Sequence, residues 1–403
     1  MTHDAELILF AGALLGVGIA ASLLATRLRL PALVLFLGLG MLIGSDGLGW
    51  IDFNNYPLAR LIGTIALVLI MFDGGLSAGW GEIRPVLRSA LRLAVAGTIV
   101  TALVAGLAAA WLFGFSPLEG LLLGAILAAT DSAAVFALMR GTRLPTRLRR
   151  TLEGEAGFND PVAVLLLLVV IELIQTPHYD AGDVAVFLLQ QVGVGVAVGV
   201  GTGRLAIAAM GRRAQLPTSL ALVASFATAA ISYGAAGALG GSGFVAVYLT
   251  GLALGSAPLR HKHVVLAFHE GLASVAEIGM FLALGLLVFP SQLGDVAVKG
   301  ILLALITAFV ARPLGVALAT WKEGFSRRER ALLGWAGLRG AVPVILATFP
   351  VIRHVPDSLE FFNIIFFAVL LSATIQGLTI QPFASQLGIA TRPVAQADAD
   401  HSR

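Results

Sequence analysis

The chain has 403 residues, of which 58% are hydrophobic and 12% are charged, and its mean hydropathy is +0.93. Soluble domains carry about 25% charged residues, so this composition excludes a soluble globular protein and indicates a polytopic membrane protein. The net charge of +3 is small and the basic residues are spread over short loops, which argues against a nucleic-acid partner. The absence of cysteine excludes disulfide, zinc–thiolate and thiol chemistry.

Thirteen hydrophobic segments are long enough to cross roughly 30 Å of hydrocarbon. Their connections are too short for a soluble domain, and residues 387–403 form a short tail. The predicted fold is therefore all-α, with about 13 transmembrane helices. The segments run approximately over residues 5–25, 28–45, 59–80, 88–113, 117–139, 151–174, 184–210, 217–237, 242–258, 264–289, 294–319, 329–352 and 360–386.

The loops predict how the chain crosses the membrane. With the N-terminus outside, most of the 26 Lys and Arg residues, including the arginines between residues 140 and 150, fall on the cytoplasmic side, as the positive-inside rule requires. Trp80, Trp111 and Trp321 fall at segment ends, where interfacial aromatic residues belong. We therefore predict a multi-pass protein of the cell (inner) membrane, with its N-terminus outside and its C-terminus cytoplasmic.

Similar sequence patterns recur in the two halves of the chain, and we divide the transmembrane domain, residues 1–386, accordingly. Repeat one covers residues 1–174, a linker helix covers 184–210 and repeat two covers 217–386. Seven crossings separate equivalent helices, so the repeats must be inverted, as in many secondary transporters. The similarity consists of Gly40, Gly44 and Ser45 against Gly251, Gly255 and Ser256, and of Met71 and Phe72 against Met280 and Phe281.

The segment over residues 151–174 carries Asp160 about 14 Å from its cytoplasmic end, near the membrane midplane. Carboxylates at this depth are costly and usually mark an ion or proton path. Pro161 follows directly and has no N–H, so the carbonyl of Gly157 loses its helical partner. With the amide of Asn159, these groups outline a cation site within one helical turn.

Two further segments carry polar residues at the same depth and have the composition of interrupted helices. Thr130 and Asp131 lie in the middle of residues 117–139, and Arg339 lies between glycines in residues 329–352. Broken helices in corresponding places of two repeats indicate a transport site. We expect Asp131 to compensate the N–H groups exposed at one break, with a ligand role as its alternative, and Arg339 to compensate the carbonyls exposed at the other.

A guanidinium buried at this depth needs an anion. We predict a structural ion pair between Glu155 and Arg339, which leaves Asp160 as the group that exchanges a proton for a cation. Asp73 lies within one or two turns of the same level and is either a ligand or part of an entry funnel. Glu277 lies at a similar depth and tunes the pH response, pairs with a group of the core or lines a wet cavity.

These residues resemble those of the monovalent cation–proton antiporters, in the subfamily with Asn-Asp in the sixth span (the sodium–proton exchanger kin). The likeness is strongest to the bacterial branch that includes potassium–proton antiporters. The matching motifs extend over essentially the whole chain: FDGGL at 72–76, TDSAAV at 130–135, EAGFNDPVAV at 155–164 and GLRGAVPV at 337–344.

The resemblance implies the sodium/proton antiporter fold, in which a core domain moves elevator-fashion against a dimerising domain of a homodimer. It implies exchange of potassium or sodium for protons at Asp160, with Asn159 and Thr130 nearby as cation neighbours and with no cofactor. Asn159 implies electroneutral one-for-one exchange, with a role in pH homeostasis. Many relatives place a serine where this chain has Ala156, and its absence favours the larger potassium ion.

Two other classes were weighed against the transporter. A cation channel requires a selectivity filter, and no repeated filter loop occurs in the sequence. An intramembrane serine protease would use Ser242 in the string GGSG together with His269, but this reading explains neither Asp160 nor Arg339. His269 and Glu270 are expected on a solvated helix face, and the chain is not expected to be an enzyme.

Overall fold

The computed structural model describes residues 2–28, 31–131, 144–211 and 216–389, and this part of the chain is helical apart from loops and one bridge between Gly211 and Leu259. It contains 8 helical stretches long and apolar enough to cross a membrane, and five shorter apolar helices. Each of the predicted segments corresponds to one of these stretches, so the predicted all-α membrane fold is confirmed. Residues 132–139, the last part of the fifth segment, lie outside the described residues.

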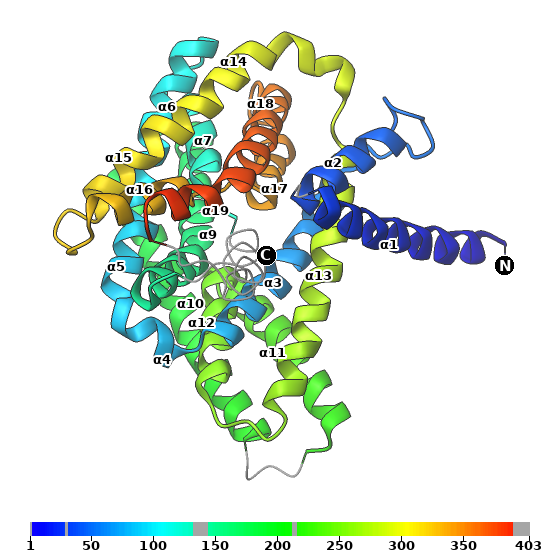
Figure 1. The fold of residues 1–403 in the computed structure, drawn as a ribbon, viewed down its shortest axis with the longest axis vertical. Helices are drawn as coiled ribbons and strands as arrows, with labels where there is room; N and C mark the ends of the chain where they lie inside the picture. Colours follow the sequence, from blue (N-terminus) through cyan, green and yellow to red (C-terminus); the bar gives the residue numbers. More distant parts are fainter. Residues whose placement is uncertain (1, 29–30, 132–143, 212–215, 390–403) are drawn as a thin grey trace, which may run out of the picture.

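One group of helices, which we call the scaffold bundle, lies to the lower right in Figure 1. Helix α3 packs along α12 and α13, α2 packs on α13, and α10 and α11 pack on α12. Its helices are α1 (Thr2–Leu28), α2 (Ala32–Ile43), α3 (Tyr56–Ala78), α10 (Ala181–Met210), α11 (Thr218–Ala238), α12 (Gly243–Ser256) and α13 (Lys262–Leu286).

The other group, which we call the core bundle, lies to the upper left in Figure 1. Helix α6 packs on α7, α7 packs on α9, and α14 and α17 pack on α18. Its members are α4 (Trp80–Ile83), η1 (Arg84–Val86), α5 (Leu87–Arg92), η2 (Leu93–Gly97), α6 (Thr98–Phe113), α7 (Pro117–Ala128), α9 (Thr146–Gln175), η3 (Pro290–Gln292), α14 (Leu293–Ile306), η4 (Thr307–Ala311), α15 (Arg312–Ala319), α16 (Arg327–Trp335), α17 (Ala341–Ile352), α18 (Ser358–Leu371), η5 (Ser372–Gln376) and α19 (Gly377–Gln386).

Glycines let the scaffold helices approach backbone to backbone. A Cβ added at Gly40 of α2 would lie 2.5 Å from the carbonyl oxygen of Leu282 in α13, and one added at Gly75 of α3 would lie 2.5 Å from the carbonyl oxygen of Tyr248 in α12. In lipid, the hydrophobic effect contributes little to helix association, so close van der Waals packing at small residues stabilises the contact instead. Larger side chains at these positions would force the helices apart.

The two halves of the core bundle carry matching irregularities. The fourth and eleventh segments contain the π-helical stretches η2 and η4. The fifth segment stops being helical after Ala128, and the twelfth is interrupted between α16 and α17. The twelfth segment therefore has its predicted break, and the fifth ends its first helix close to Thr130 and Asp131, as predicted.

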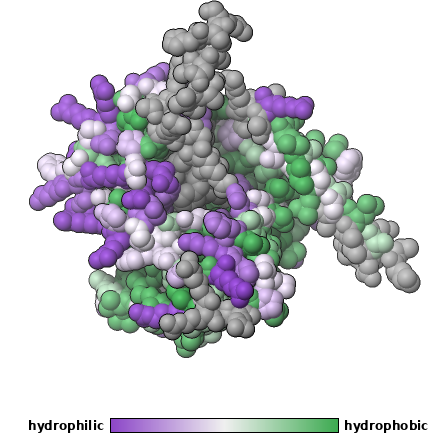
Figure 2. All heavy atoms as spheres, turned by 60° about the horizontal axis from the view of Figure 1, so that its bottom comes forward, coloured by the Kyte–Doolittle hydropathy of each residue, from purple (hydrophilic) through white to green (hydrophobic). Residues whose placement is uncertain are grey.

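The outer surface is suited to lipid. Large apolar side chains such as Leu107 (69% exposed), Leu189 (74%) and Leu205 (72%) point away from the bundles. Figure 2 shows hydrophobic side chains covering part of the surface beside a strongly hydrophilic region. This arrangement confirms a multi-pass integral membrane protein.

Candidate cation site

The two broken segments meet through their backbones. The N–H of Asp131 donates to the carbonyl of Leu338 at 2.7 Å, so the break after α7 is joined to the break before α17. The carboxylate of Asp131 lies against Gly340, where a Cβ would overlap its Oδ2 atom. Gly340 is the N-cap residue of α17, and a carboxylate at a helix N-terminus is stabilised by the exposed N–H groups and the helix dipole. Asp131 therefore lies where a compensating carboxylate is needed.

Asn159 holds the break after α7 with both ends of its amide. Its Oδ1 accepts from the N–H of Thr130 at 2.7 Å, and its Nδ2 donates to Thr98 Oγ1 at 2.5 Å and to the carbonyl of Ala128 at 3.5 Å. These contacts fix the non-helical peptides beside Asp160 and satisfy groups that the helix end leaves exposed. We therefore interpret Asn159 as a positioning residue of the site.

Asp160 lies in the middle of α9 and is 1% exposed. Asn159, its neighbour in the chain, ties Thr130 to the same level of the structure. The Oγ1 of Thr130 is buried and has no hydrogen-bond partner in the described part of the chain. A carboxylate and an unsatisfied hydroxyl at one level are the oxygen groups with which proteins replace the hydration shell of a monovalent cation.

The structure corrects the predicted ion pair. Glu155 is bonded to Arg312, whose Nη2 lies 2.8 Å from Oε1 and 2.9 Å from Oε2, and the prediction that it pairs with Arg339 is wrong. Residue counting gives the depth of a side chain but not the direction in which it points from an all-apolar helix, so the partner of Glu155 could not be chosen from the sequence.

Arg339 is buried at 3% exposure within the break before α17. Its Nη1 donates to the carbonyl of Gly337 in the same break, and its backbone N–H donates to Ser372 Oγ at 2.7 Å. The Nε and Nη2 atoms have no hydrogen-bond partner among the described residues, and the side chain lines a narrow cavity together with Ser372 and Gln376. Arg339 thus contacts a carbonyl freed by the break, and Glu155 is not its direct partner.

The remaining predicted residues lie on helices of the scaffold bundle. Asp73 and Glu277 are half-buried on α3 and α13 of the scaffold bundle, and Glu270 is exposed as expected. His269 is fully buried, with Nε2 2.9 Å from Ser225 Oγ, so its expected place on a solvated face is wrong. Ser242 caps α12 by accepting from the N–H of Val245 at 3.4 Å and is not the bonded partner of His269. The geometry therefore gives no support to the serine protease alternative.

Three residues near the site were not predicted from the sequence. Arg312 lies within a predicted span. A charged residue inside a span usually has a functional or structural role, and this rule alone could have identified Arg312 as a candidate. Thr98 and Tyr248 are single polar residues in apolar segments, and helices that are apolar on every side give no periodicity from which to read their orientation. Tyr248 packs on α9 beside Phe158, with ring centroids 5.1 Å apart.

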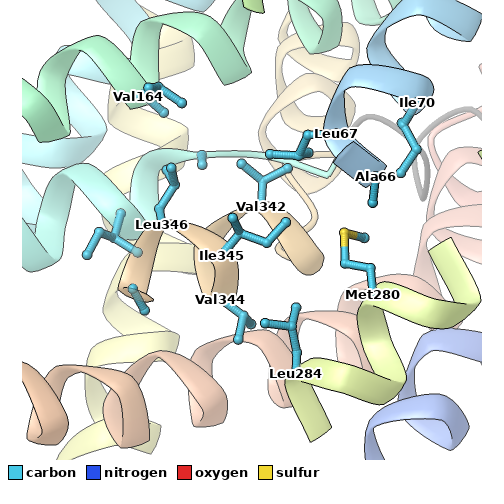
Figure 3. Close-up of a cluster of buried hydrophobic side chains, with 14 of the residues drawn as sticks. Ala66, Leu67, Ile70, Val164, Met280, Leu284, Val342, Val344, Ile345 and Leu346 are labelled. Carbon is cyan, nitrogen blue, oxygen red and sulfur yellow. The ribbon is translucent and has the colours of Figure 1, made fainter. Parts of the chain in front are cut away.

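A hydrophobic cluster lies where helices of the two bundles meet, as Figure 3 shows. It joins α3 and α13 of the scaffold to α9 and α17 of the core, and a Cβ at Gly63 would lie 2.7 Å from Ile345 Cγ1. Val164, one turn beyond Asp160 on α9, lies in this cluster. The labelled members are Ala66, Leu67, Ile70, Val164, Met280, Leu284, Val342, Val344, Ile345 and Leu346.

Crossed broken helices around a buried carboxylate, in a protein of this many spans, define a secondary-transporter architecture. The chain belongs to the family described as "Sodium/hydrogen exchanger, transmembrane", whose model matches residues 12–386. The family resemblance drawn from the four sequence motifs is thereby confirmed. The fold agrees with that of the sodium proton antiporter MjNhaP1 from Methanocaldococcus jannaschii, with a TM-score of 0.82, 25% identity, and coverage of 94% of this chain and 98% of that chain.

Several curated relatives are similar over most of the chain. The K(+)/H(+) antiporter NhaP of Alkalimonas amylolytica is 45% identical over 386 residues, which cover 94% of this chain and 66% of the relative. The K(+)/H(+) antiporter NhaP2 of Shewanella baltica is 40% identical, over 92% of this chain and 65% of the relative. The Na(+)/H(+) antiporter ApNhaP of Aphanothece halophytica is 29% identical, over 87% and 69%. The chain thus spans about two thirds of the length of these relatives, which are antiporters and not enzymes by name.

Proposed function

We propose that the chain exchanges a monovalent cation for protons, with Asp160 as the site that the two ions share. The observation that carries this proposal is the balance of buried charge. Among the described residues, three carboxylates (Asp131, Glu155 and Asp160) and two guanidiniums (Arg312 and Arg339) are each at most 3% exposed. With all five ionised, one negative charge remains.

One proton or one monovalent cation cancels that remaining charge. A net charge is costly to move through a low-dielectric interior, so either loaded form can cross between the two sides and the empty form cannot. This rule gives obligatory exchange, and because both loaded forms are neutral it gives electroneutral one-for-one stoichiometry. Thr130 supports the cation form with its hydroxyl.

We propose potassium as the transported cation, with sodium as the alternative. The relatives at 45% and 40% identity are named K(+)/H(+) antiporters, whereas the relative at 29% is named a Na(+)/H(+) antiporter. Exchange of either cation for protons would serve pH homeostasis.

The core bundle is proposed to move against the scaffold bundle, which would form the contact of a homodimer. The apolar contact between α3 and α17, where Gly63 faces Ile345, supports such sliding, because apolar surfaces can change neighbours without leaving a charge unpaired. In the membrane we place the N-terminus outside the cell, the C-terminus in the cytoplasm and the apolar cluster of Figure 3 on the outer side of Asp160. The division into repeat one (1–174), linker helix (184–210) and repeat two (217–386) belongs to the same proposal.

The test is exchange in proteoliposomes with a lumenal pH dye. Adding potassium or sodium should move protons in the wild type with the membrane potential clamped at zero, and Asp160→Asn should abolish this movement because an amide does not cycle a proton. Proton movement of wild-type size in Asp160→Asn would exclude the shared site. A pH change that disappears under the voltage clamp would exclude electroneutral exchange.

A further inference from the structure

Tyr248 is a scaffold residue that reaches the ion-site helix of the core bundle. It lies on α12 and is 1% exposed, and its ring meets Phe158 edge to face at an interplanar angle of 77°. The ring and hydroxyl lie directly on Gly157, where a Cβ would overlap both Cζ and Oη. Only glycine at this position permits the phenol to approach the backbone of α9 so closely.

The hydroxyl of Tyr248 is buried and has no hydrogen-bond partner among the described residues. A buried hydroxyl without a partner destabilises a protein, and buried tyrosines usually find one. Each such group in a native structure calls for an explanation, such as a bound ion or water. The phenol therefore needs a ligand that this chain does not itself provide.

The position of the hydroxyl identifies that ligand. Gly157 and Asp160 are three residues apart on α9 and share a helix face. Helical side chains lean towards the N-terminus and cover the preceding turn, so the carboxylate of Asp160 is directed over the turn that contains Gly157. The unsatisfied Thr130 hydroxyl is held at the same level by Asn159.

We propose that the Tyr248 hydroxyl is an oxygen ligand of the monovalent cation, supplied to the Asp160 site by the scaffold bundle. The inference rests on the proposed function and deepens it. A site formed by oxygens of both bundles is complete only while the bundles are in this arrangement. Movement of the core bundle leaves Tyr248 behind, so the cation is held more weakly after the crossing and is released there.

The first experiment compares Tyr248→Phe with wild type in the proteoliposome assay, with Tyr233→Phe as the matched control. Tyr233 is a half-buried scaffold tyrosine that packs on Phe244, so the control removes a hydroxyl from the same bundle but not from the site. Tyr248→Phe should raise the apparent KM for potassium about tenfold, because contacts to a charged group are worth that much, at an unchanged maximal rate. Tyr233→Phe should leave both values unchanged.

A readout independent of transport is the rise in melting temperature that potassium or sodium causes in detergent. The wild type and Tyr233→Phe should show this rise, and Tyr248→Phe should lose most of it at the same cation concentration. A Tyr248→Phe protein with wild-type KM and a wild-type melting response overturns the ligand role, while exchange that still depends on Asp160 leaves the antiport proposal intact. Absence of exchange in the wild type itself overturns the antiport proposal.

The contact with Gly157 provides a second, geometric test. Gly157→Ala should lower the maximal rate, because the added methyl overlaps the Tyr248 ring. Removing the ring in Gly157→Ala/Tyr248→Ala should restore the rate while the KM for potassium stays high, since the hydroxyl is still missing. Wild-type kinetics in Gly157→Ala, or no recovery in the double variant, contradicts the described contact.

Discussion

The two bundles bury polar groups in different ways. The scaffold bundle satisfies neutral hydroxyls locally: Thr202, Ser232 and Thr250 lie 2.8 to 3.2 Å from one another between α10, α11 and α12. The core bundle instead buries charged residues. The polar groups buried there are satisfied by backbone groups at the helix breaks, by the ion pair between Glu155 and Arg312, and by the amide of Asn159. Charge at this depth requires dedicated partners, whereas hydroxyls bond to the helices that carry them.

The difference indicates which bundle carries the ions. Every buried carboxylate of the described residues belongs to the core bundle, and the scaffold contributes Ala66, Leu67, Ile70, Met280 and Leu284 to the apolar cluster of Figure 3. In the proposed elevator movement, the core bundle would carry the buried charges past scaffold helices that hold no buried carboxylate among the described residues. Mutations in the two bundles should therefore have different effects. Substitutions of buried polar residues in the core bundle should reduce both stability and exchange.

The largest effect is expected for Arg312→Ala. Removing this guanidinium strands the buried carboxylate of Glu155, and breaking a buried pair costs about 3–5 kcal/mol of stability. Arg339→Ala should cost less, because Glu155 keeps Arg312. Thermal unfolding in detergent, combined with Glu155→Gln in a double-mutant cycle, measures the coupling. A cycle that couples Glu155 to Arg339 more strongly than to Arg312 would restore the original pairing.

Asn159→Ala should have the next largest effect. The substitution removes the acceptor of the Thr130 N–H and the donor to Thr98, and each unsatisfied buried group costs about 1–3 kcal/mol. The break beside Asp160 then loses its fixed shape, so exchange should fall even at temperatures where the protein remains folded. Circular dichroism confirms the folded state, and proteoliposome exchange gives the loss. Normal exchange by a folded Asn159→Ala protein would show that the amide does not position the site.

These two predictions also show what the sequence can and cannot specify. Glycine, proline and small polar residues allowed both helix breaks to be predicted. Asp160 could be identified as a candidate site residue because a carboxylate is costly in an apolar span. Span length and the loop arginines sufficed for the number of helices. Depth along a helix follows from residue counting, and the three residues that this count predicts to lie in one layer, Asp131, Arg339 and Asp160, are all buried.

Rotation about the helix axis was the missing information. Segments that are apolar on all sides have no face that periodicity can identify, so the partner of Glu155 and the contact of Tyr248 with Gly157 could not be predicted. Arg312 follows directly after the π-helical stretch η4. A π-helical turn changes the direction of the side chains that follow it, and no residue pattern predicted this stretch.

The smallest effect comes from a matched pair of substitutions, Thr98→Val in the core and Thr250→Val in the scaffold. Both threonines are fully buried, and valine keeps their shape while it removes the hydroxyl. Interhelical hydrogen bonds of this kind average about 0.6 kcal/mol in membrane proteins, so both variants should melt only slightly below the wild type. Thr98 accepts from Asn159, however, whereas Thr250 bonds only within the scaffold.

Exchange should therefore separate two variants that stability does not. Thr98→Val leaves the Asn159 donor without its 2.5 Å acceptor and loosens the break beside Asp160, so its exchange rate should fall. Thr250→Val should transport at the wild-type rate. The measurement is initial proton flux at saturating potassium, normalised to the amount of reconstituted protein. Equal losses in both variants would mean that the two bundles contribute alike to the transport step, and the separation into a charge-carrying core and a fixed scaffold would then be wrong.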